Sequence, residues 1–275
     1  YLIDGMDNNE NFLGGPKFEL PTGMIKDITV LSSTYSAEFG RTGNGIFNVT
    51  TRSGGNAYTG EAFYLTRPGP PLDASSPFAQ RDLSGNAVKN GFSRQQGGFS
   101  LGGPIVHDQT FFFVNAEHTT DFKDNLLNVP ALNVNETVAG RNHLSYLSAR
   151  IDHRWSARWR STLRANGQRV RIDRQGGGLT GGVRFASAAD TQVRDGWHVA
   201  LANTYTGGRW LYESNVQYSG FNWDFAQPDN PSAPQVNMLA PDGTTTLGIL
   251  GHPGFRFDEA ERTVQVQQKV RYSGT

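Results

Sequence analysis

The sequence predicts a mostly β fold: part of an antiparallel up-and-down transmembrane β-barrel, preceded by a small α/β unit. Three observations predict the barrel. Apolar and polar residues alternate along the strands, the connections are alternately very short and very long, and aromatic residues gather at both strand ends. A soluble β-sandwich also alternates apolar and polar residues, but it has no reason to place short turns and long loops at opposite ends.

The alternation is clearest in residues 263–272, and the same pattern starts at about residue 144. Successive side chains of a strand point to opposite faces, so the apolar set meets lipid in a barrel and the polar set lines the lumen. We expect lipid contact for Val199, Leu201, Val216, Val264 and Val266. We expect Gln217, Gln265 and Lys269 to face the lumen.

The connections differ in length in a regular way. Residues 156–158 predict a short turn, and Gly207-Gly208 is a two-residue hairpin signal. Long polar loops are expected at 66–95, 174–195 and 222–261. Outer-membrane barrels have short turns on the periplasmic side and long loops outside the cell.

The aromatic residues form two groups. Those beside the short turns are Trp155, Trp159, Tyr205, Trp210 and Tyr212. Those near the long loops are Trp197, Tyr218 and Trp223. Two aromatic girdles around an apolar band are typical of a membrane barrel, although aromatic residues also pack the core of a sandwich.

Composition excludes several classes. The 25 basic and 25 acidic residues balance, so no nucleic-acid partner is expected. The lack of cysteine fits an oxidising compartment, and no apolar run approaches the length of a transmembrane helix. No signal peptide precedes Tyr1, so we expect a fragment of a longer protein. No catalytic motif is present, which predicts neither an enzyme nor a cofactor.

Residues 1–57 have a different pattern. Short apolar strands are expected at 25–31 and 45–51, with a helix-compatible segment at 33–39 between them. Glycine, asparagine and proline interrupt these strands, which predicts a small α/β unit distinct from the barrel strands.

Four motifs follow one another in the first 118 residues: YLIDGMDNN at 1–9, YSAEFGR at 35–41, GNGIFNVTTRSGGN at 43–56, and a segment with LGGPI and TFFF at 98–113. In this order they resemble the plug and first barrel hairpin of TonB-dependent outer-membrane receptors, in particular the Oar-like branch. The resemblance implies that 1–57 is the C-terminal part of a plug and that 58–275 holds the first roughly eight barrel strands. Plugged transporters have about 22 strands, so this part cannot close by itself.

The resemblance also implies a location and a function. The protein would lie in the outer membrane of a Gram-negative bacterium and take up a substrate when the inner-membrane TonB system pulls the plug. Its other partners would be outer-membrane lipid and an extracellular oligosaccharide, peptide or metal chelate. Two alternatives are a passive barrel or adhesin-like surface protein and a soluble β-sandwich binding module.

Two sets of site residues are predicted. Contacts between plug and barrel are expected at Glu38, Arg41, Arg52 and Glu117, with Glu61, Arg150 and Arg164 as further wall residues. The alternative is that these charges are simply solvated in the lumen. Ligand contacts are expected in the long loops, from Phe78, Phe92, Trp223, Phe225 and Phe255.

Oxygen-bearing side chains also gather near the start of the chain, at Asp4, Asp7, Asn8, Asn9 and Glu10. Calcium needs six to eight oxygen ligands, but the spacing lacks the EF-hand pattern. Asn and Asp are also the residues that tight turns prefer. The turn is the favoured interpretation, and no metal is predicted.

Overall fold

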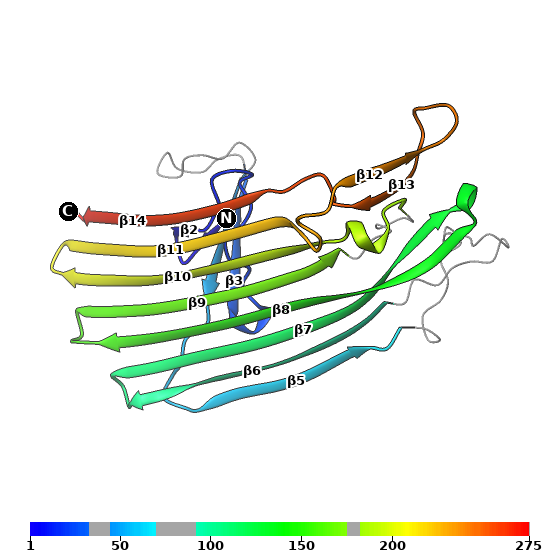
Figure 1. Ribbon diagram of the computed structural model, residues 1–275. Helices are drawn as coiled ribbons and strands as arrows, with labels where there is room; N and C mark the ends of the chain where they lie inside the picture. The colour runs from blue at the N-terminus through cyan, green and yellow to red at the C-terminus, as the bar shows by residue number, and fades with distance from the viewer. Residues whose placement is uncertain (33–44, 70–91, 175–181, 275) are drawn as a thin grey trace.

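The computed structural model describes residues 1–32, 45–69, 92–174 and 182–274, and it contains two main sheets (Figure 1). The larger has eight strands in the order β14-β11-β10-β9-β8-β7-β6-β5, and every neighbouring pair is antiparallel. Its strands are β5 (Thr59–Arg67), β6 (Phe92–Val106), β7 (Thr110–Val129), β8 (Val134–Arg154), β9 (Trp159–Arg174), β10 (Asp190–Gly207), β11 (Trp210–Pro228) and β14 (Asp258–Tyr272). This meander confirms the predicted fold class; among the described residues it is an open sheet, with β5 and β14 at its edges.

The sheet presents an apolar outer face and a polar inner face. Val264 lies opposite Tyr218 and Val266 lies opposite Val216, and all four side chains are exposed on the outer face. Gln217 points the other way and is buried against the N-terminal residues. The predicted assignment of residues to the two faces therefore agrees with the structure.

Short turns join the strands at one end of the sheet (Figure 1). Residues 155–158 connect β8 to β9, one residue more than predicted, and the Ser156 hydroxyl accepts hydrogen bonds from the backbone of Arg158 and Trp159. Between β10 and β11 the turn contains Gly208, whose φ of +57° favours glycine. At the opposite end the connections are longer, with one exception: only residues 130–133, which include the 3₁₀ helix η2 (Pro130–Leu132), join β7 to β8. The long connections contain the 3₁₀ helix η3 (Ala186–Ala188) and the hairpin of β12 (Gln235–Leu239) and β13 (Thr246–Gly251).

The strands are longer than the sequence predicts at this end. Strand β11 continues to Pro228 and β14 starts at Asp258, so the expected loop 222–261 is partly strand. Pairing continues through Asn222↔Ala260 and Trp223↔Glu259. Polar residues mark the end of the apolar band, but backbone hydrogen bonds continue beyond it, and the alternation pattern does not report them.

Residues 1–32 and 45–51 contain the smaller sheet and are here called the N-terminal unit. Its strands are β1 (Leu2–Ile3), β2 (Met6–Asp7), β3 (Ile25–Leu31) and β4 (Ile46–Thr51), in the order β2-β1-β4-β3, with β1 parallel to β4. The 3₁₀ helix η1 (Thr22–Met24) precedes β3, and the helix expected at 33–39 lies outside the described residues. No described helix is long and apolar enough to cross a membrane.

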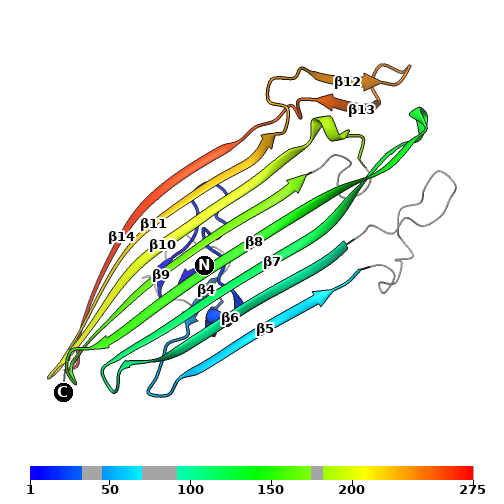
Figure 2. The same ribbon diagram turned by 60° about the horizontal axis from the view of Figure 1, so that its bottom comes forward.

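The N-terminal unit lies against the inner face of the large sheet (Figures 1 and 2). Its own core is small and contains Ile3, Met6, Phe18, Met24 and Val49. Phe18 also reaches the large sheet, where its ring meets the edges of Tyr146 and His198 at centroid distances of 6.3 and 5.5 Å. Most other contacts between the two sheets are polar, and they form the candidate site.

Candidate functional site: the polar interface and the aromatic mouth

Asp4 is placed by a tight turn at the end of β1. Its φ is +48° and that of Gly5 is +82°, values that Asp and Gly adopt more readily than most residues. The backbone N–H of Asp4 donates to Val49 O at 2.8 Å, and the N–H of Gly5 donates to the Asn48 side chain at 2.9 Å. Because β1 and β4 are parallel, the turn brings the Asp4 carboxylate beside Thr51, at the end of β4.

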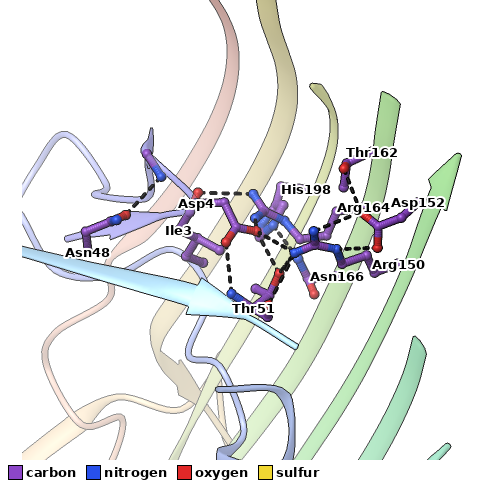
Figure 3. Close-up of polar contacts among 11 residues, drawn as sticks. Ile3, Asp4, Asn48, Thr51, Arg150, Asp152, Thr162, Arg164, Asn166 and His198 are labelled. Atoms are coloured by element: carbon purple, nitrogen blue, oxygen red, sulfur yellow. Dashed lines mark hydrogen bonds and ion pairs between the residues drawn. The ribbon is translucent and has the colours of Figure 1, made fainter. Parts of the chain in front are cut away.

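The Asp4 carboxylate joins the N-terminal unit to two arginines of the large sheet (Figure 3). It accepts hydrogen bonds from the backbone N–H and the hydroxyl of Thr51, at 2.8 and 2.7 Å. It also forms an ion pair with Arg164 of β9, and its Oδ2 lies 3.7 Å from Arg150 Nη1 of β8. Arg164 additionally donates to Ile3 O at 3.2 Å, so one guanidinium binds both the carboxylate and the backbone of the unit.

Arg150 is held by a carboxylate of its own strand. Asp152 accepts two hydrogen bonds from it, each 2.8 Å long, and Thr162 donates to the same carboxylate at 2.7 Å. Arg150 then donates to the hydroxyl and carbonyl oxygens of Thr51, at 2.7 and 3.2 Å. We call these five residues, Asp4, Thr51, Arg150, Asp152 and Arg164, the Asp4 cluster; its two guanidinium charges are balanced by two carboxylates.

A second group of contacts anchors residues 11–19. Lys17 forms an ion pair with Glu261 of β14 and donates to the Thr263 hydroxyl at 2.8 Å. The carbonyl oxygen of Lys17 accepts from Gln168 at 2.8 Å and lies over Gly196, where a Cβ would be only 2.1 Å away. Gly196 therefore allows the backbone of the N-terminal unit to approach the sheet closely.

Glu19 and Asp7 complete the interface. Glu19 accepts from the Tyr146 hydroxyl at 3.3 Å and lies 3.7 Å from Arg194. Gln217 donates to Asp7 O at 2.9 Å, and Gln265 accepts from Asp7 N at 3.1 Å. The unit is thus held at several separate points by short polar contacts.

The predicted contact residues are distributed differently. Arg150 and Arg164 do reach the N-terminal unit. Arg52 donates to Ile25 O within that unit at 3.0 Å, and Glu117 accepts from Gln96 of the neighbouring strand at 2.6 Å. Arg52 and Glu61 both line a cavity of about 350 Å³ between the unit and strands β5 to β7. Glu38 and Arg41 lie outside the described residues.

Sequence reasoning missed Asp4 and Lys17 as contact residues. In the sequence Asp4 is one member of an oxygen-rich segment, and the other members of that segment contact residues within the N-terminal unit. Asp7 accepts from Asn9, Asn8 donates to Phe18 O at 2.6 Å, and Glu10 accepts from the backbone N–H groups of Phe12, Leu13 and Gly15. Within the described ranges, no three His, Asp or Glu side chains are grouped as a metal site would require.

Aromatic side chains gather at the long-loop end of the inner face. Trp223 and Phe225 of β11 stack edge to face at 5.5 Å, Trp223 contacts Phe257 at 5.9 Å, and Phe225 contacts Phe255 at 6.1 Å. Phe12 of the N-terminal unit completes the group, 5.0 Å from Phe257. We call these five residues the aromatic cluster. Both Phe12 and Phe255 are exposed.

Three of the predicted ligand residues, Trp223, Phe225 and Phe255, are thus brought together. Phe78 lies outside the described residues, and so does the side chain of Phe92, whose backbone starts β6. Phe12 and Phe257 were not predicted. The sequence around Phe12 gives no barrel pattern, and only the fold brings it beside a loop some 240 positions away.

Comparison with known proteins supports the barrel. Residues 50–143 match a family described as outer membrane beta barrel domain. The TonB-dependent transporter Oar of Myxococcus xanthus is 31% identical over 117 residues, which are 41% of this chain and 11% of that protein. The chain therefore matches only a small part of this curated relative.

Two solved structures share the fold. The outer membrane transporter YddB from Escherichia coli superposes with a TM-score of 0.74 at 12% identity, covering 99% of this chain and 37% of the transporter. The siderophore receptor PirA from Acinetobacter baumannii gives a TM-score of 0.59 at 14% identity, covering 97% of this chain and 36% of the receptor. The chain is thus built on an outer-membrane β-barrel fold and belongs in the outer membrane of a Gram-negative bacterium.

Proposed function

We propose that the protein is an active outer-membrane transporter, in which the N-terminal unit is part of a plug that TonB displaces to admit a substrate. The observation that carries the proposal is the Asp4 cluster, a charged contact between a small separate sheet and the inner face of a barrel wall. A passive barrel needs no such unit on its inner face. The similarity to the TonB-dependent transporter Oar supports the same function.

The chemistry of the interface suits a plug that must stay attached to the barrel wall and then detach from it. Its contacts are mainly hydrogen bonds and ion pairs, with little shared apolar core. Water can replace each polar contact once it is exposed, so the cost of separating the unit is divided among several contacts that a pull breaks one after another. The buried pair of Asp4 and Arg164 is the strongest of them. A large hydrophobic interface would resist such a pull far more strongly.

The aromatic cluster is the proposed ligand contact. Aromatic faces stack on sugar rings, peptide side chains or the aromatic groups of metal chelates, which are the three substrate classes we propose. Phe12 is 63% exposed and belongs to the N-terminal unit, whereas the other four rings belong to the barrel wall and its loop. A ligand bound there would touch both the plug and the wall.

The test uses the full-length protein in living cells and needs no known substrate. Cysteine replaces Gln217, which is buried beneath Asp7, and an impermeant thiol reagent is added outside. We expect labelling only when TonB is present and the inner membrane is energised. Cysteine at the exposed Phe255 should label under all conditions and is the control. Equal labelling of position 217 with and without TonB would refute the gated plug and favour a passive barrel.

A further inference from the structure

The outer face of the sheet carries a group of basic side chains at its long-loop end. Arg169 and Arg171 of β9 lie two residues apart on the same face, and His143 and Ser145 of β8 lie directly opposite them. Arg141, next to His143 on this face, lies over the Phe122 ring at 5.2 Å. We call Arg141, His143, Arg169 and Arg171 the outer basic patch. Arginine on the outer face of a membrane barrel is costly unless it lies above the apolar band.

The aromatic residues place this patch relative to the membrane. Tyr205 is opposite Trp159 at the short-turn end, and Trp197, eight residues along β10, is opposite Gly167. Eight residues span about 26 Å along a strand, or about 20 Å of membrane depth at a tilt of about 40°. Trp197 and Tyr218 meet edge to face, with ring centroids 5.0 Å apart, and mark the outer girdle. Arg169 is the next residue on this face beyond Gly167, so it lies at headgroup level.

The guanidinium groups are available at this level. The Arg169 side chain is 74% exposed and its Nε lies 3.6 Å from Asp195; the Arg171 side chain is 49% exposed and its Nε lies 3.1 Å from Asp173. Arg141 has no carboxylate partner among the described residues. Among the side chains that the structure describes on this surface, three arginines have two aspartate partners, and a further anion would complete their charge balance.

We propose that the outer basic patch binds the phosphate groups of a phosphorylated lipid in the outer leaflet of the outer membrane. The guanidinium group of arginine can donate two parallel hydrogen bonds to phosphate oxygens. His143 and Ser145 lie beside the arginines as further hydrogen-bonding groups. Trp197 and the exposed Leu147 lie one row nearer the membrane centre, and Tyr218 lies two rows nearer, where the acyl chains of the same lipid would pack. This inference depends on the outer-membrane location and not on plug movement.

The test uses the full-length protein, purified and delipidated in a non-ionic detergent, and titrated with lipid A, which carries two phosphates. Binding is read by native mass spectrometry, with phosphatidylcholine as the neutral-headgroup comparison. A basic residue near an anionic membrane surface contributes about fivefold in binding, so Arg169→Gln/Arg171→Gln should weaken lipid A binding by about 25-fold. Added salt should weaken it further.

A matched double variant at the other end of the same strand, in the last turn residue before it and its second strand residue, is the control. Arg158→Gln/Arg160→Gln removes two positive charges at the short-turn end and should leave lipid A binding unchanged. Folding of every variant is checked by its faster migration on unheated gels, and Arg169→Lys, which keeps the charge, should lose less than the glutamine variant. Equal affinity in both double variants would overturn the proposal. Displacement of lipid A by equimolar inorganic phosphate would show an anion site without lipid selectivity, which would also overturn it.

Discussion

Neutralising Asp4 tests the contact between the N-terminal unit and the barrel wall most directly. The substitution Asp4→Asn keeps the shape of the side chain and is tolerated at the positive φ of this position. It removes the charge that Arg164 pairs with, and Arg164 is only 3% exposed. Arg150 suffers less, because Asp152 still accepts two hydrogen bonds from it.

The expected cost follows from this difference between the two arginines. Breaking a buried ion pair from one side costs about 3–5 kcal/mol. Arg164 keeps its hydrogen bond to Ile3 O, and Asp4 is partly accessible to lumen water, so we expect a cost just below this range, about 2–3 kcal/mol. Opening of the N-terminal unit should then become about 30- to 150-fold more frequent.

Hydrogen exchange of the Thr51 and Asp4 amides, which lie inside this contact, measures that opening. In the double variant Asp4→Asn/Arg164→Gln neither buried charge is left alone, so the double should be more stable than the two single costs added together. Strict additivity, or a change below threefold in Asp4→Asn, would show that the ion pair does not hold the unit in place.

Three further outcomes are expected. Leu201→Arg, on the outer face, should cost about 2–4 kcal/mol of folding free energy in lipid. Gln265→Arg should cost about 1 kcal/mol, because it loses one hydrogen bond. Equal costs in denaturant titrations of the two variants would contradict the face assignment. Gly196→Ala should push the N-terminal unit off the wall and increase its cleavage by protease, because the new Cβ would clash with the backbone carbonyl of Lys17. Gly167→Ala places its Cβ in open space and should leave the cleavage unchanged. Hydrogen bonds from Thr245 and Thr244 lower the pKa of Asp242 to about 2, so its support of the β12–β13 turn is full above about pH 4 and is lost as the pH falls towards 2. Thr245 amide exchange should follow that window, and Asp242→Asn should abolish it.

The outer face of the sheet was predictable, but the docking of the N-terminal unit was not. Residues such as Val264 and Leu201 are fixed by a period of two, which a local pattern reports directly. The wall residues Arg150 and Arg164 could be named because they occupy polar positions of predicted strands. Their partner Asp4 could not be named, because the sequence around a carboxylate that follows a short strand is the same whether that carboxylate serves a turn, a metal site or an ion pair.

Contacts between distant segments account for the rest. Lys17 meets Glu261 only after β14 has taken its place at the sheet edge, and nothing in the sequence around either residue encodes that distance. The same holds for Phe12 and Phe257. Alternation determines which way a side chain points, but it does not determine what lies opposite.

The length of the strands determines where a ligand would first meet this protein. Strand β8 has 21 residues, about 69 Å along the strand, and at a tilt of about 40° it rises about 50 Å. The apolar band needs only about 25 Å. Trp155 and Trp159 lie beside the short turn, so nearly all of the excess stands on the cell-surface side. The hairpin of β7 and β8 therefore rises about 20 Å above the lipid, whereas β9, with 16 residues, ends lower. A ligand would meet the tip of this hairpin well before it reaches the membrane surface.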